Sequence, residues 1–156
     1  MEALLAALEA SPLATATRSD RWVYATVNGA HVLGVALLVG AIVPLDLRLL
    51  GAWSGVDRAA LARVLSRTAA AGLALAVVTG AMLFASRASE YAEIRVLQAK
   101  LALVLAGALV ALAARRRYGA ALEEASTGRR VAIAVVSLGC WVGALALGRL
   151  IAFVGG

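Results

Sequence analysis

Four long apolar stretches are the feature of this 156-residue sequence that most restricts its fold. A helix that crosses a bilayer needs about 20 mostly apolar residues, and each stretch is close to that length and bounded by charged residues. The hydrophobic share of 63% also exceeds the roughly 45–50% that is usual in soluble domains. We therefore predict an all-α polytopic membrane protein, a four-transmembrane-helix bundle within residues 22–156. The predicted spans are residues 22–45, 68–85, 97–114 and 131–154.

The fifteen basic residues, which give a formal net charge of +6, are unevenly distributed. Nine of them follow the first or the third span: Arg48, Arg58, Arg63, Arg67, Arg115, Arg116, Arg117, Arg129 and Arg130. The positive-inside rule assigns such segments to the cytoplasm, so we expect a bacterial inner-membrane protein with both termini periplasmic. No aromatic or Gly-rich nucleic-acid motif accompanies the arginines, which argues against binding to DNA or RNA.

Residues 1–21 are expected to form an N-terminal segment along the outer membrane surface. Glu2 and Glu9 stand where a signal peptide would have basic residues, so the segment should remain in the mature protein. Its leucines form the apolar face of a short interfacial helix, and Ser11 followed by Pro12 is typical of a cap and first position of another.

The second long helix is expected to begin before its apolar stretch, at Asp57. Asp57 has the character of a helix cap, and a basic amphipathic segment follows it with Arg58, Arg63 and Arg67. We expect these arginines to meet anionic lipid headgroups. Near the end of the preceding span, Asp46 and Arg48 are expected to pair with each other or with headgroups.

His31 is the only histidine, and it lies about 13 Å below Trp22 along the first span. An ionisable residue at that depth usually faces the bundle interior, a cofactor or a proton path. Gly34 is its neighbour on the helix surface. A small residue there permits tight helix packing, and it also leaves room for a flat ligand.

Two further cationic residues share the outer half of the bundle with His31. Lys100 lies about 5 Å below the start of the third span, and Arg149 about 7 Å below the outer end of the fourth. Heme b would suit this set, with iron on the His31 imidazole and the propionates toward Lys100 and Arg149. The predicted cofactor-binding residues are His31, Lys100, Arg149 and Gly34, with His31 as the axial ligand.

Two other interpretations of His31 stay open. A neutral histidine can simply hydrogen-bond a neighbouring helix, with Thr79 or Asn28 as partner, in a noncatalytic accessory or scaffold subunit of a larger membrane complex. Copper handling would need several soft ligands, and the chain offers His31 with Cys140, Met1 and Met82. The sequence has no motif of a soluble catalytic domain, so we expect no stand-alone enzyme, and an oxidoreductase if there is one.

The segments NGAHVLGVALLVGAIVPLDLRLLG and QAKLALVLAGALVAL resemble an uncharacterised family of small four-helix bacterial membrane proteins. That family is similar in turn to the copper-resistance protein D membrane domain and to HemJ-type protoporphyrinogen oxidases. The resemblance implies a bound heme and roles for His31, Arg48 and Lys100. It also implies a redox or electron-transfer function within the membrane.

One departure from the relatives limits this implication. They often carry another histidine after the lysine, where this chain has alanine and leucine at positions 111–113. Two histidines of one chain therefore cannot hold the iron. The resemblance then implies a five-coordinate iron or a sixth ligand from Lys100, Met82, Cys140, water or a neighbouring subunit.

Overall fold

The computed structural model describes residues 2–119 and 121–154, and its regular secondary structure in these ranges is entirely helical. Each predicted span lies within one long helix. The shortest of the four has 24 residues and is about 36 Å long, enough to cross the hydrocarbon core. The predicted all-α bundle is confirmed, and four helices of this length and hydropathy define a multi-pass membrane protein. These helices are α3 (Arg21–Leu49), α4 (Arg58–Ser86), α6 (Arg95–Tyr118) and α7 (Thr127–Val154).

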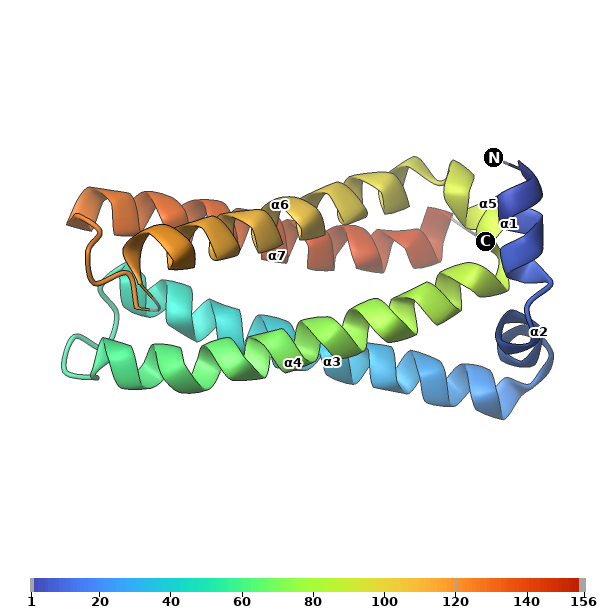
Figure 1. Ribbon diagram of the computed structural model, residues 1–156, viewed down its shortest axis with the longest axis horizontal. Helices are drawn as coiled ribbons and strands as arrows, with labels where there is room; N and C mark the ends of the chain where they lie inside the picture. Colours follow the sequence, from blue (N-terminus) through green and yellow to red (C-terminus); the bar gives the residue numbers. More distant parts are fainter. Residues whose placement is uncertain (1, 120, 155–156) are drawn as a thin grey trace.

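The long helices form two antiparallel pairs (Figure 1). Helix α3 packs along α4, α6 packs along α7, and the pairs meet through α3 and α7. Within residues 2–119 and 121–154, no Cα atom of α4 comes within 8 Å of one in α6. The side of the bundle between α4 and α6 is therefore joined by side chains alone.

A central apolar cluster holds the two pairs together. Trp141 of α7, only 2% exposed, packs with Leu38 and Ile42 of α3, and Leu73 of α4 and Val104 of α6 lie against this group. A residue from every long helix thus meets at one level. In lipid this packing must come from shape, because the tails around the bundle are as apolar as the side chains inside it.

Glycines bring the backbones of α3 and α4 into contact. A Cβ atom at Gly72 would lie 2.5 Å from the Leu38 backbone nitrogen, and one at Gly34 would lie 2.7 Å from the Ala76 nitrogen. The predicted close packing is therefore confirmed at Gly34. Gly34 follows an alanine by four residues, and so do Gly29 and Gly40 of α3. A Cβ atom at Gly29 or Gly40, however, would have no neighbour within 4 Å.

Three short helices lie at the end of the bundle where α3 begins and α7 ends (Figure 1). They are α1 (Glu2–Glu9), α2 (Pro12–Ser19) and α5 (Ala88–Glu93). The predicted cap is confirmed, since the Ala14 amide donates to Ser11 Oγ at the start of α2. The sequence analysis did not predict α5, which is a single short turn of helix between two spans.

Side chains connect these short helices to the bundle. The Ser89 amide of α5 donates to Glu9 Oε1 at 2.7 Å, and Arg18 of α2 donates to the Ser86 carbonyl oxygen at 3.2 Å. The same amide lowers the pKa of the Glu9 carboxyl, because its N–H stabilises the charged form. The N-terminal segment therefore lies on the end of the bundle, in contact with α4 and α5.

The opposite end carries the loops that join α3 to α4 and α6 to α7. Asp57 caps α4 by accepting from the Ala60 amide at 2.6 Å, as predicted. Arg48 donates to the carbonyl oxygens of Val56 and Ser54, and so folds the first loop back on α3. The predicted pairing of Arg48 with Asp46 is wrong, because the Arg48 guanidinium group donates its hydrogen bonds to carbonyl oxygens of the loop backbone.

Candidate functional site

His31 lies between α3 and α4, where it links the two helices by hydrogen bonds. Its Nδ1 atom lies 3.0 Å from the Ala76 carbonyl oxygen and 3.1 Å from Thr79 Oγ1. Thr79 was one of two predicted partners, and this prediction is confirmed. The other, Asn28, is exposed and points elsewhere on α3.

These partners determine which nitrogen of His31 carries the hydrogen. A carbonyl oxygen only accepts, so the short contact with Ala76 requires a hydrogen on Nδ1. Thr79 uses its own hydroxyl hydrogen on the Leu75 carbonyl oxygen at 2.6 Å, so its oxygen also accepts from Nδ1. In the neutral imidazole the lone pair is then on Nε2. Within the part of the chain that the structure describes, Nε2 has no hydrogen-bond partner.

Gly80 of α4 has no side chain, and the His31 imidazole ring lies against α4 at this position. A Cβ atom at this position would lie 3.1 Å from His31 Cε1 and 3.4 Å from Nδ1. A larger residue would therefore push the ring away from Ala76 and Thr79. The sequence analysis missed Gly80, although it lies one turn after Ala76 on the helix face that the histidine meets.

Lys100 is the second predicted site residue that the fold brings toward this place. Its side chain is half-buried, and its Cε and Nζ atoms lie 3.4 Å from where a Cβ of Gly148 on α7 would be. His31 and Lys100 lie in the same half of the bundle, the half in which α3 and α6 begin.

The other two predicted site residues lie elsewhere. Gly34 is buried, and the backbone of α4 occupies the space beside it, so its role is the contact between α3 and α4. Arg149 is exposed, and its guanidinium carbon lies 4.8 Å from the centre of the Phe153 ring. The structure thus gives Gly34 a packing contact and Arg149 a contact with Phe153, and the role of these two residues in cofactor binding stays a prediction.

Cys140, one of the soft ligands considered for copper, lies away from His31. Cys140 is buried beside Gly107 in the α6–α7 contact, eight residues or about 12 Å along α7 from Gly148. Met1 lies outside the described residues. Among the side chains that the structure describes, no three His, Cys, Asp or Glu residues form a group that could hold a metal ion.

A second polar position lies deeper in the bundle, toward the loop end. Asp46 is 4% exposed, and its Oδ2 atom has no hydrogen-bond partner among the described residues. Ser137 of α7 is also a buried polar residue. Asp46 is 15 residues, or about 22 Å, along α3 from His31, so the two groups belong to separate sites.

Comparison with models of protein families, with curated proteins and with solved structures gave no match for this chain. The fold and the apolar helices define the class, a multi-pass membrane protein built as a four-helix bundle. What the His31 site binds must therefore be argued from its own chemistry.

Proposed function

We propose that this protein resides in a bacterial inner membrane with both termini periplasmic, and that it holds one heme b on His31 as a redox or electron-transfer component. The observation that carries the proposal is the hydrogen bonding of the imidazole. Nδ1 donates to the Ala76 carbonyl oxygen, which fixes the ring and leaves the Nε2 lone pair for a metal. Heme ligation by histidine commonly has this arrangement, because the second hydrogen bond orients the ligand.

The surroundings of His31 also suit a heme. Lys100 lies in the same half of the bundle as His31, and its ammonium group would pair with a propionate. The side between α4 and α6 has no backbone packing, so a flat apolar group could enter there from the lipid. When bound, the heme would supply one-electron transfer, while the chain would orient the iron ligand and hold the propionate charge.

The orientation in the proposal rests on the distribution of arginines. Both termini lie at one end of the bundle, and the two Arg-rich connections lie at the other (Figure 1). Arginine-rich connections are retained on the cytoplasmic side. His31 and Lys100 would then lie in the periplasmic half of the membrane.

The test is the absorption spectrum of the detergent-purified protein, oxidised and dithionite-reduced, before and after addition of hemin. We expect a Soret band with reduced α and β bands in the wild type and loss of these bands in His31→Ala. The matched control is Asn28→Ala, which removes an exposed polar side chain one turn earlier on α3. A featureless spectrum of folded wild-type protein after hemin addition would refute the proposal.

A second candidate function has its own supporting observation. Both side-chain hydrogen bonds of His31 among the described residues go to α4, so the residue can serve as a link between two helices of a noncatalytic accessory subunit. Such a link in a membrane is worth about 0.6 kcal/mol on average and less than about 2. If the wild type binds no heme and His31→Ala lowers stability by that amount, this function is the better one.

A further inference from the structure

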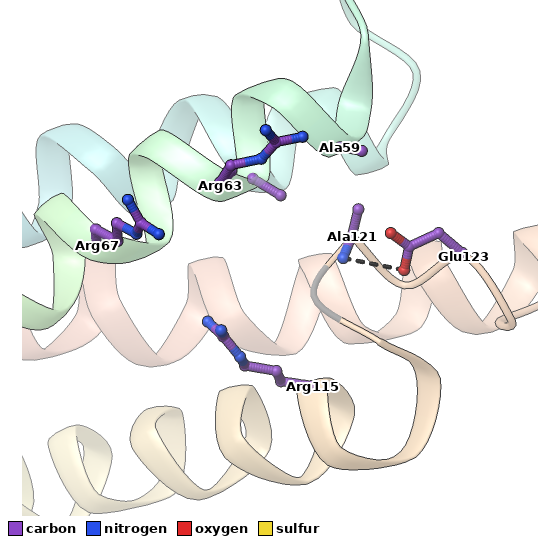
Figure 2. Close-up of a pocket in the computed structure, with 7 residues that line it drawn as sticks. Ala59, Arg63, Arg67, Arg115, Ala121 and Glu123 are labelled. Carbon is purple, nitrogen blue, oxygen red and sulfur yellow. Dashed lines mark hydrogen bonds between the residues drawn. The ribbon is translucent and has the colours of Figure 1, made fainter.

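A cavity of about 210 Å³ lies at the loop end of the bundle, far from His31. Arg63 and Arg67 of α4 line it on one side, Arg115 of α6 on the other, and Glu123 of the following loop closes its end (Figure 2). Three small side chains complete the lining: Ala59, Ala62 and Ala121. The cavity therefore lies between the two helices that do not pack against each other.

The three arginines line the cavity from two helices. Arg63 and Arg67 are four residues apart and so share one face of α4, while Arg115 comes from the last turn of α6. All three are exposed. In residues 2–119 and 121–154 none of them forms an ion pair or a side-chain hydrogen bond within the protein, so their donors are available.

Glu123 neutralises only part of this charge. Its Oε2 atom accepts from the Ala121 amide at 3.2 Å and so shapes the loop. Three guanidinium groups and one carboxylate leave the lining with two net positive charges. Like charges around one cavity repel, and a bound anion would relieve that repulsion.

We propose that this cavity binds the phosphate group of an anionic phospholipid whose acyl chains lie between α4 and α6. Guanidinium groups are suited to phosphate because their planar donors pair with two oxygens at once. Basic pockets between transmembrane helices on the cytoplasmic side are where anionic headgroups bind. Arg67 and Arg115 directly adjoin the apolar stretches, which is the depth at which phosphates of a bilayer lie.

The helix surfaces beyond the arginines provide space for the acyl chains. On α4, Ala71 follows Arg67 on the same face and is exposed. On α6, Ala111 lies one turn before Arg115 on the same face of the helix, nearer the membrane centre, and is also exposed. Small, exposed apolar residues thus follow the basic cavity on both helices. A free phosphate would contact the arginines only, whereas a phospholipid would contact both the arginines and these apolar helix surfaces.

The test is native mass spectrometry of the detergent-purified full chain with dioleoylphosphatidylglycerol, dioleoylphosphatidylcholine or inorganic phosphate. We expect retention of phosphatidylglycerol in preference to phosphatidylcholine. The variant with Arg67→Gln and Arg115→Gln should bind phosphatidylglycerol about 30-fold more weakly. The matched control, Arg116→Gln with Arg129→Gln, removes two charges at the same end of the bundle outside the cavity and should change affinity by less than about fivefold.

Two outcomes would overturn the proposal. Equal loss in both double variants would show that the lipid responds to overall charge, and retention of inorganic phosphate with no preference for phosphatidylglycerol would assign the cavity to a free anion. Glu123→Gln provides a second test if the arginine variant fails to fold. It keeps an oxygen acceptor for Ala121 and removes the negative charge, so phosphatidylglycerol binding should strengthen, and unchanged or weaker binding would contradict the proposal.

Discussion

Replacement of Gly72 by alanine is expected to destabilise the α3–α4 pair. The new Cβ atom would lie 2.5 Å from the Leu38 nitrogen, 2.7 Å from the Gly34 carbonyl oxygen and 2.9 Å from Leu37 Cβ. The first two of these atoms belong to the backbone and cannot rotate away. The two helices must therefore separate, which also weakens the nearby hydrogen bond from His31 to α4.

The expected loss follows from two opposing effects. An extra methyl group in a well-packed site costs about 1–3 kcal/mol, and contact with backbone atoms favours the upper end of that range. Alanine in a helix recovers about 1 kcal/mol relative to glycine. The net loss in the free energy of unfolding is then about 2 kcal/mol, which for a protein of this size lowers Tm by about 4–8 °C.

The assay is thermal unfolding of the detergent-purified variant, followed by circular dichroism. Gly40→Ala is the matched control, because a Cβ atom at Gly40 of α3 meets nothing within 4 Å. That variant should have an unchanged or higher Tm. If Gly72→Ala is as stable as Gly40→Ala, the two helix backbones do not touch at Gly72, and the account of α3–α4 packing is refuted.

Three further predictions concern the ends of the bundle. Because the Ser89 amide lowers the pKa of the Glu9 carboxyl, the contact of α1 with α5 is favoured above the ordinary carboxyl pKa of 4.5 and is lost as the pH falls through the lowered value. Hydrogen-exchange protection of the Ser89 amide should fall accordingly in acid, and equal protection at about pH 6 and about pH 3 would contradict this. Asp57→Ala removes the acceptor for the Ala60 amide and should cost about 1 kcal/mol in thermal unfolding, whereas an unchanged Tm would argue against the cap. A cysteine in place of the exposed Glu124 should resist an impermeant maleimide in intact cells, and labelling there would reverse the proposed orientation.

Part of the candidate site could be predicted because it depends on depth along a helix. The positions of His31 and Lys100 within their apolar stretches put both in the outer half of a bundle, whichever helices are neighbours. Thr79 could be predicted as a partner for the same reason. Arg149 was predicted at a similar depth. Its contact with Phe153, however, depends on the direction in which its side chain leaves the helix, and depth along the helix does not determine that direction.

Other features could not be predicted because several positions share one local pattern. Gly34 and Gly40 both follow a small residue at four-residue spacing, yet only Gly34 lies against α4. The carboxyl of Asp46 was expected to pair with Arg48, two residues along the chain, or both residues with headgroups. Residues two apart point to different sides of a helix, so Asp46 is buried in the bundle while Arg48 binds loop carbonyls.

The sequence by itself determined the membrane class, the four long helices and the capped starts of α2 and α4. These follow from local requirements, since a chain in lipid must satisfy its backbone hydrogen bonds within each helix and a cap involves only adjacent residues. The tertiary structure decided that α3 pairs with α4, that His31 bonds to Ala76, and that Arg67 and Arg115 meet across one cavity. Those contacts join residues far apart in the chain, and they depend on which small residues allow two helix backbones to approach.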